Sequence, residues 1–226
     1  VPPRSRWSDD DPRVAALRRL EAAGVTVRTV AADITDPVAT RAALDALELP
    51  PVRGVVHAAG TVHSALLHRL EADDLRAVMR PKTDGALVLH ELFPPGSTDF
   101  FVLFSSAGPL LGLPGQGAYA AANTFLDVLA AHRRAGGHGE TVSLAWTSWR
   151  GLGMATSAEA TDVELAARGT TDIAPDRALR AFDQTVGHPS SALVAVLGLR
   201  PGHTGPRPAL LSDLALGEAG QPAEVP

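Results

Sequence analysis

The chain has 226 residues, and 45% of them are hydrophobic, which is sufficient for one compact domain with a sizeable core. Its formal net charge is −5 with no block of like charge, which argues against a nucleic-acid or anionic-membrane surface and favours a small or acyl-type substrate. The absence of cysteine excludes disulfides and thiolate metal sites. No apolar run approaches the ~20 residues of a membrane span, and the polar, proline-rich start is unlike a signal peptide, so we expect a cytoplasmic location.

Short apolar runs rich in β-branched residues alternate with segments of helical period along the chain. Strands buried on both faces are predicted at Val25–Ala31, Val52–His57, Phe100–Ser105, Val142–Trp146 and Ala192–Leu197. Helices are predicted around Val14 to Leu20 before Gly24, after the cap Asp36-Pro37, from Glu71 to Leu92 with a break at Pro81, from Ala118 to about Arg134, and from Pro175 to Val186. This alternation predicts an α/β fold with a parallel sheet covered on both faces.

The two ends of the chain differ from an ordinary nucleotide-binding fold. Such a sheet usually begins with a strand, a glycine-rich turn and a helix whose N-terminus holds a pyrophosphate. This chain begins with polar residues and contains no G-x-G-x-x-G motif. Two explanations stay open from the residues alone: the protein binds no dinucleotide, or the chain starts part-way through a domain. From about Pro201 the composition is typical of a linker.

One region combines residue types that are rare in this chain. A predicted strand ends in Ser105 and Ser106, a glycine-rich loop follows, and the next helix carries Tyr119, the only tyrosine, with Asn123 one turn later. Ligands of open α/β sheets bind at the carboxyl ends of strands. A phenol has a pKa near 10, so it needs a nearby cation to exchange protons near neutral pH, and Lys82 is the only lysine. The alternative is that the tyrosine simply packs and the lysine is solvated.

The spacing of Lys82, Ser106, Tyr119 and Asn123 resembles the catalytic tetrad of the ketoreductase domains of polyketide synthases, a branch of the short-chain dehydrogenase/reductase superfamily. Most members of that superfamily carry Tyr-x-x-x-Lys, whereas this branch exchanges the lysine and asparagine positions, as here. The resemblance also includes the segments AADITD, GVVHAAG, RPKTDGA, LFSSAG, GQGAYAAAN and SLAWTSW. It is strongest with iterative, partially reducing synthases of the 6-methylsalicylic or naphthoic acid type.

The resemblance implies a role for each member of the tetrad. Tyr119 would protonate the alkoxide that forms when hydride adds to a β-ketone, and Ser106, rather than Ser105, would donate a hydrogen bond to the same oxygen. Lys82 would lower the pKa of the tyrosine and hold the nicotinamide ribose, and Asn123 would order a water in the proton relay.

The cofactor implied by the resemblance is NADPH. Adenine contacts are expected from Asp33 and Ile34, and nicotinamide contacts from Trp146, Thr147 and Ser148, with residues 149–168 as a substrate lid. The remaining expected cofactor residues are His57, Ala58, Ala59, Gly60, Ser105, Lys82 and Tyr119. His57, Trp146 and Trp149 could equally be core residues. We expect no metal, because His57, His63 and His68 have no clustered carboxylate or cysteine partner.

The implied fold is a Rossmann-like doubly wound parallel sheet that lacks the first β-α-β unit, with a ketoreductase domain at 1–200 and a linker at 201–226. The implied reaction is reduction of the β-keto group of a polyketide intermediate held on the phosphopantetheine of an acyl-carrier domain, with other synthase domains in the same chain as partners. Two alternatives remain: a non-catalytic structural fragment, and a stand-alone β-ketoacyl reductase of fatty-acid type, which would carry Tyr-x-x-x-Lys.

Overall fold

The computed structural model describes residues 8, 11–152, 159–187 and 190–212, which belong to two compact units, Val1–Val52 and Arg53–Pro226. The first unit contains α1 (Pro12–Ala22) and α2 (Pro37–Asp45). Each helix has a proline in its first turn and an aspartate N-cap: Asp11 accepts a hydrogen bond from Arg13 N, and Asp36 accepts from the two backbone amides of residues 38 and 39. The helix predicted around Val14 to Leu20 and the helix start predicted at Asp36-Pro37 are confirmed.

The predicted strand Val25–Ala31 is wrong. The segment has no strand assignment, although its valines and threonines have high β propensity. A strand is stabilised by a ladder of hydrogen bonds to a neighbour, and all four strands of the main sheet come from the second unit. Composition alone therefore did not determine the conformation of this segment.

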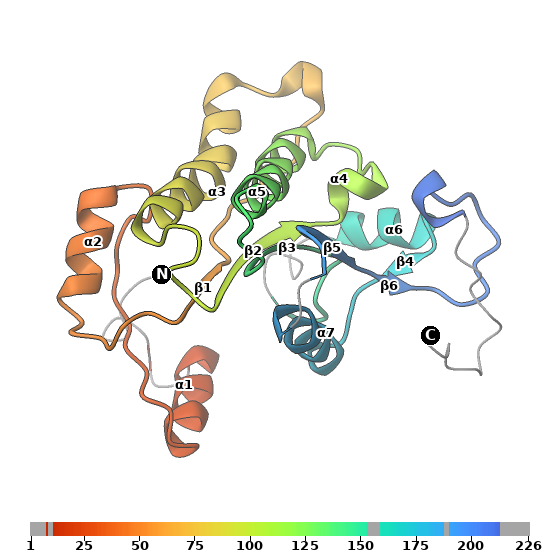
Figure 1. The fold of residues 1–226 in the computed structure, drawn as a ribbon. Helices are drawn as coiled ribbons and strands as arrows, with labels where there is room; N and C mark the ends of the chain where they lie inside the picture. The colour runs from red at the N-terminus through yellow and green to blue at the C-terminus, as the bar shows by residue number, and fades with distance from the viewer. Residues whose placement is uncertain (1–7, 9–10, 153–158, 188–189, 213–226) are drawn as a thin grey trace. The chain divides into compact units, whose positions relative to one another are not determined.

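The main sheet of the second unit has four parallel strands in the order β1-β2-β3-β5 (Figure 1). Their bounds are Gly54–His57, Phe100–Ser106, Thr141–Trp146 and Leu193–Val196. Four of the five predicted strands are thus confirmed to within a few residues. Because the strands are parallel, their carboxyl ends lie at one edge of the sheet, where Ser106 pairs with Trp146 and His57 pairs with Leu103.

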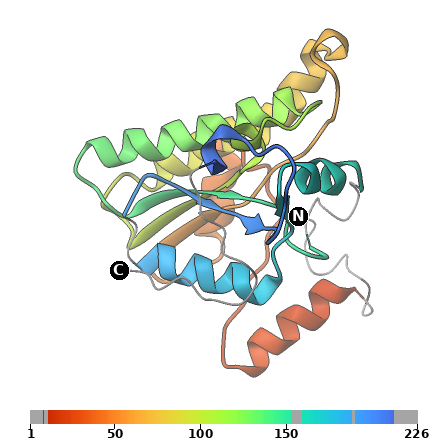
Figure 2. The same ribbon diagram turned by 90° about the vertical axis from the view of Figure 1, so that its right-hand side faces the viewer.

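Helices cover both faces of this sheet, as predicted. The helices α3 (Ala72–Leu92) and α5 (Gly117–Ala135) lie side by side on one face, and α7 (Pro175–Gly187) lies on the other (Figures 1 and 2). Val102, Val142 and Leu144 of the central strands form a core with Ala178 and Phe182 of α7. The shorter elements are η2 (Leu67–Arg69), α4 (Gly108–Leu111), α6 (Glu159–Ala167), η4 (Ala209–Leu211), and the antiparallel pair β4 (Thr170–Thr171) and β6 (Gly198–Leu199).

The predicted break of α3 at Pro81 is also wrong, because the helix continues through the proline. A proline has no N–H and leaves the carbonyl oxygen four residues earlier without its helical partner. Here Thr61 Oγ1 donates a hydrogen bond of 3.1 Å to that oxygen, on Ala77. A side chain from the loop after β1 replaces the missing donor, so Lys82 lies within a continuous helix.

Part of the predicted linker is packed against the domain. Leu211 in η4 is buried in a cluster with Leu111 and Leu165. Residues 213–226 lie outside the described residues, and the role of 201–226 as a linker stays a prediction.

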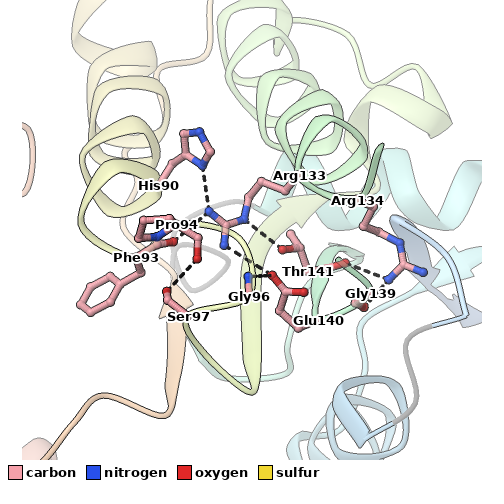
Figure 3. A network of polar contacts seen from close by, with 10 residues as sticks. All are labelled: His90, Phe93, Pro94, Gly96, Ser97, Arg133, Arg134, Gly139, Glu140 and Thr141. Carbon is pink, nitrogen blue, oxygen red and sulfur yellow. Dashed lines mark hydrogen bonds and ion pairs between the residues drawn. The ribbon is translucent and has the colours of Figure 1, made fainter. Parts of the chain in front are cut away.

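The helix ends near the amino ends of β2 and β3 are joined by Arg133 of α5 (Figure 3), whose side chain is fully buried. Arg133 Nε donates to Thr141 Oγ1 at 2.9 Å, and Nη1 donates to the Phe93 carbonyl at 3.0 Å and lies 2.8 Å from His90 Nδ1. Its guanidinium carbon is 3.8 Å from the centre of the Phe101 ring. One cation thereby connects the C-terminal ends of α3 and α5 to both central strands.

Candidate active site

Lys82 projects from α3 into the interior, where it is only 3% exposed. Its Nζ donates a 2.7 Å hydrogen bond to the carbonyl oxygen of Phe104 in β2. Its stem passes over Gly60, where an added Cβ would lie 2.9 Å from Lys82 Cε. Burial lowers the pKa of Lys82 to about 8, and the negative charge of Asp127 opposes that shift. The lysine is therefore a buried, held ammonium and not a solvated surface group.

Tyr119 and Asn123 lie on one face of α5, close to this ammonium. Lys82 Nζ is 5.7 Å from the centre of the Tyr119 ring. Asn123 is fully buried, its Nδ2 donates a 2.7 Å hydrogen bond to the Tyr119 carbonyl, and its Oδ1 has no hydrogen-bond partner within the described part of the chain. Burial raises the pKa of Tyr119, and the Asn123 side chain opposes this, so the phenol keeps its proton at neutral pH. The structure brings the lysine, tyrosine and asparagine together as the sequence predicted.

The two serines at the end of β2 have different surroundings. Ser105 is buried, and its Oγ donates a 3.3 Å hydrogen bond to the Asn123 carbonyl in α5. Ser106 is partly exposed, and its Oγ accepts a 3.1 Å hydrogen bond from Gly108 N. Successive strand residues point to opposite faces, which explains the separation. The Gly108 amide orients the Ser106 oxygen while its hydroxyl hydrogen can still be donated.

His57, at the end of β1, is 1% exposed, and neither of its ring nitrogens has a hydrogen-bond partner among the described residues. Burial and then the Lys82 charge lower the pKa of His57 to about 4, against a weaker effect of the backbone at Lys82 and Pro81. The imidazole is neutral at physiological pH. Ala58, Ala59 and Gly60 follow in the loop after the strand, and their predicted contact with a cofactor, like that of His57, stays a prediction.

The KR domain family matches residues 3–151, two thirds of the chain, and its members are ketoreductases of polyketide synthases. The chain belongs to this family. It is 46% identical to a 6-methylsalicylic acid synthase of Aspergillus niger and 48% identical to a 5-methyl-1-naphthoate synthase of Streptomyces sahachiroi, over 97% of this chain and 13% of each relative. The ketoreductase from the first module of phoslactomycin biosynthesis in Streptomyces sp. HK803 is 40% identical, with a TM-score of 0.76 over 84% of this chain and 43% of that chain.

Membership in the ketoreductase family confirms the predicted α/β reductase fold and the class of nicotinamide-dependent reductases. The chain spans only a small part of the curated relatives it matches, which are large synthases. A stand-alone reductase of fatty-acid type is not favoured, because the relatives are synthases and because Asn123 occupies the position of the lysine in Tyr-x-x-x-Lys.

Trp146, at the end of β3, belongs to an aromatic cluster of the ketoreductase core. Its ring centre lies 5.6 Å from that of Phe104 and 5.0 Å from that of Trp149. Thr147 Oγ1 accepts a 3.0 Å hydrogen bond from Gly198 N, and the Ser148 carbonyl accepts one from Ile173 N. Both tryptophans are thus at least core residues, and contact of residues 146–148 with a nicotinamide stays a prediction.

Only part of the predicted lid can be compared with the structure, because residues 153–158 lie outside the described residues. Arg168, which follows α6, donates to the carbonyl oxygens of Leu111 at 2.8 Å and Gly112 at 3.0 Å. It also pairs with Glu164 within its own segment. The C-terminal end of the predicted lid is therefore attached to the end of α4, just after the Ser106 loop.

The predicted adenine-contacting residues, Asp33 and Ile34, belong to the first unit. There Asp33 Oδ1 accepts hydrogen bonds from Thr35 N and Oγ1, and the contact of both predicted residues with adenine stays a prediction.

In the described residues no group of three histidine, aspartate or glutamate side chains could hold a metal ion, and His63 instead lies 3.5 Å from Asp74. Among the helices that are described, none is long and apolar enough to span a membrane.

Asp127, which sequence reasoning missed, is a partly buried acidic residue whose side chain bonds to β3. It lies on α5 one turn after Asn123, and its Oδ1 accepts a 2.6 Å hydrogen bond from Ser143 Oγ of β3. Burial raises the pKa of Asp127, while Ser143, Ser105 and the Lys82 charge oppose the shift. One signal in the sequence could have identified it: Asp127 is the only acidic residue in an otherwise apolar and basic helix.

Proposed function

We propose that this chain reduces the β-keto group of a carrier-bound β-ketoacyl thioester to a β-hydroxyacyl thioester, with NADPH as the hydride donor. The observation that supports this most directly is the buried Lys82 ammonium, 5.7 Å from the centre of the Tyr119 ring and bonded to β2 just before Ser106. A buried cation beside a phenol is an arrangement suited to proton transfer near neutral pH. In a family of ketoreductases, a ketone oxygen is the acceptor that fits such a donor.

The donor set fits a nicotinamide nucleotide. The bond to the Phe104 carbonyl uses one of the three N–H donors of Lys82, which leaves donors for the hydroxyl groups of a ribose. The Tyr119 hydroxyl offers a further donor and acceptor beside it. When bound, NADPH supplies a hydride to the ketone carbon. Lys82, Tyr119 and the residues after β1 would hold its nicotinamide half.

The proton chemistry follows from three side chains. Tyr119, protonated because burial raises its pKa, donates its proton to the ketone oxygen as negative charge develops there. The Ser106 hydroxyl, oriented by the Gly108 amide, donates a hydrogen bond to the same oxygen. The Lys82 ammonium stabilises the phenolate that remains on Tyr119.

Reprotonation of Tyr119 requires a path to solvent, and Asn123 is well suited to provide one. Its Oδ1 is buried and has no hydrogen-bond partner among the described residues, whereas buried acceptors are normally paired with protein or ordered water. A water held by this oxygen would complete the relay. The Nδ2 bond to the Tyr119 carbonyl fixes the amide so that Oδ1 is the atom available to that water.

The substrate is delivered, in this proposal, by an acyl-carrier domain through its phosphopantetheine arm, within a cytoplasmic polyketide synthase. The similarity to synthases of which this chain spans 13% supports the presence of other domains in the same polypeptide.

The test is NADPH oxidation by the full-length polypeptide with the N-acetylcysteamine thioester of acetoacetate. Tyr119→Phe removes only the hydroxyl, so kcat/KM should fall by about 10²- to 10⁴-fold, with NADPH binding retained. Thr124→Ala, on the exposed side of the same helix, is the matched control and should behave as wild type. Unchanged reduction by Tyr119→Phe would contradict the proposal and favour a structural role for this domain.

A further inference from the structure

Pro81 leaves an open hydrogen-bond acceptor in α3, just before Lys82. In a regular helix the amide of residue 81 would donate to the Ala77 carbonyl, but a proline has no N–H and its ring crowds that carbonyl. Prolines are therefore among the usual sites of helix kinks. The direction in which the lysine side chain leaves α3 depends on how this turn is held.

Thr61 supplies the missing donor from outside the helix. Its Oγ1 donates a hydrogen bond of 3.1 Å to the Ala77 carbonyl oxygen. The residue before it is Gly60, where an added Cβ would lie 2.9 Å from Lys82 Cε and displace the side chain. Two consecutive loop residues thus contact the lysine and its helix: Thr61 holds the backbone of the turn, and Gly60 leaves room for the side-chain stem.

The loop that carries these two residues is attached at both ends. It leaves the sheet after His57, the last residue of β1. At its far end Ala65 N donates a 2.9 Å hydrogen bond to the Gly115 carbonyl, just before the start of α5. The Thr61 hydroxyl therefore reaches α3 from a loop that is also bonded to the segment leading into the helix of Tyr119.

We propose that Thr61 is a positioning residue for Lys82: its hydroxyl replaces the donor that Pro81 removes and so holds the turn of α3 that carries the ammonium. The inference rests on the proposed reductase function and extends it to a loop residue whose contact is with the helix backbone. Thr61 and Pro81 act as a pair, because the hydroxyl is needed only where the helix lacks its own N–H. This dependence distinguishes the positioning role from simple packing.

The experiment measures kcat and the KM for NADPH, per folded molecule, in the full-length polypeptide with the acetoacetyl thioester. Thr61→Val keeps the shape of the side chain and removes the hydroxyl. Because Lys82 is proposed to bind the ribose and to stabilise the phenolate, kcat/KM should fall by about threefold to tenfold, with a higher KM for NADPH and a lower kcat. Thr61→Ser keeps the hydroxyl and should behave nearly as wild type. A role in stability alone would lower the folded fraction and leave both constants unchanged.

Pro81→Ala tests the pair directly. Alanine restores the N–H that the Ala77 carbonyl lacks, so α3 can complete its own hydrogen bond. This variant alone should stay within about twofold of wild type. Adding Thr61→Val to it should change kcat/KM by less than about twofold, although the same substitution costs about threefold to tenfold beside the proline.

The matched control is Thr185→Val in α7, on the other face of the sheet (Figure 2). Thr185 Oγ1 also donates to a helix carbonyl, that of Ala181, at 2.7 Å. That carbonyl lies four residues before Thr185, whose own amide is its regular helical donor, so the hydroxyl is dispensable there. The control should leave kcat and the KM for NADPH unchanged.

The outcomes separate the two proposals. The role of Thr61 is overturned when Thr61→Val matches wild type, or when it costs as much in the Pro81→Ala protein as beside the proline. A wild-type protein that does not reduce the thioester overturns the proposed function instead. The Thr61 contact is then still tested by hydrogen exchange of the α3 amides around Lys82, which Thr61→Val should accelerate in the wild-type background and not in the Pro81→Ala background.

Discussion

The paired helices α3 and α5 bury two cations, one toward each end of the strands, and hold them differently. Near the amino ends of the strands, the fully buried Arg133 side chain bonds to Thr141, Phe93 and His90 and stacks over the Phe101 ring (Figure 3). Near the carboxyl ends, Lys82 is 3% exposed and makes one hydrogen bond, to the Phe104 carbonyl. The guanidinium has several partners that hold it, whereas much of the ammonium's bonding capacity is left for a ligand.

The neighbours of the two cations differ in the same way. Glu140 accepts a hydrogen bond from Gly96 N and lies 3.8 Å from the Arg133 Nη2 atom that makes no hydrogen bond in the described region. Near Lys82, Asn123 Oδ1 and both His57 nitrogens are buried without partners among the described residues. Orphaned buried polar atoms thus occur at both ends, but those near Lys82 lie beside a cation with unused donors, so this end fits a ligand, whereas the Arg133 end fits a structural role.

The largest expected effect is on stability, at the amino end. Arg133→Met should lower the free energy of unfolding by about 3–5 kcal/mol, because it removes a buried cation and leaves its polar partners unpaired. Hydrogen exchange of β2 and β3 in the full-length polypeptide measures this local stability. Arg134→Met, a less buried neighbour that donates to the Gly139 and Thr141 carbonyls, is the control and should cost about 1 kcal/mol or less.

Reduction per folded molecule should be unchanged in Arg133→Met. A loss of kcat/KM in protein that is still folded would mean that the two ends are coupled, and the division between stability and catalysis would not hold.

The next effect is the pH dependence of stability at Lys82. Its folded pKa, about 8, lies below the unfolded value of 10.5, so between these pH values the unfolded chain binds the extra proton and stability rises with pH. The gain is at most about 3 kcal/mol, since one pKa unit corresponds to about 1.4 kcal/mol. Lys82→Met should be at least as stable as wild type at neutral pH, lack this rise and reduce no thioester. The measurement is the difference in hydrogen exchange between wild type and variant from about pH 7 to about pH 9.5.

The fold was predictable where a local pattern coincided with burial on both faces of a strand. The apolar runs predicted β2 and β3 correctly, whereas Val25–Ala31 has similar residues and is not assigned as a strand. The break predicted at Pro81 followed a local rule that Thr61, sixteen residues before the Ala77 carbonyl it bonds, overrides. Strand pairing and the Thr61 hydrogen bond both join segments that are separated in the sequence, so local sequence patterns do not predict them.

The site was predictable for a different reason. The spacing of Lys82, Ser106, Tyr119 and Asn123 is a family pattern, and the structure brings the lysine, tyrosine and asparagine together. Asp127 has no such pattern, because one acid on a helix can face solvent or the sheet. The hydrogen bond from Ser143 Oγ of β3 to Asp127, which only the structure shows, establishes that this acid faces the sheet.

The smallest expected effect distinguishes the two ends most sharply. Asn123→Ala removes a fully buried side chain whose Oδ1 has no hydrogen-bond partner among the described residues, and it places a good helix former in α5. The loss of the bond from Nδ2 to the Tyr119 carbonyl and the removal of the orphaned oxygen have opposite effects on stability. The local opening free energy of α5 measured by hydrogen exchange should therefore stay within about 1 kcal/mol of the wild-type value.

If Asn123 orders the water that returns a proton to Tyr119, kcat should nevertheless fall by about tenfold with little change in NADPH binding. Asn123→Asp, which keeps an oxygen at this position, should recover part of that loss. A large drop in stability with unchanged kcat would place Asn123 with Arg133 among the structural residues, and the carboxyl end would then rely on Lys82 and Tyr119 alone.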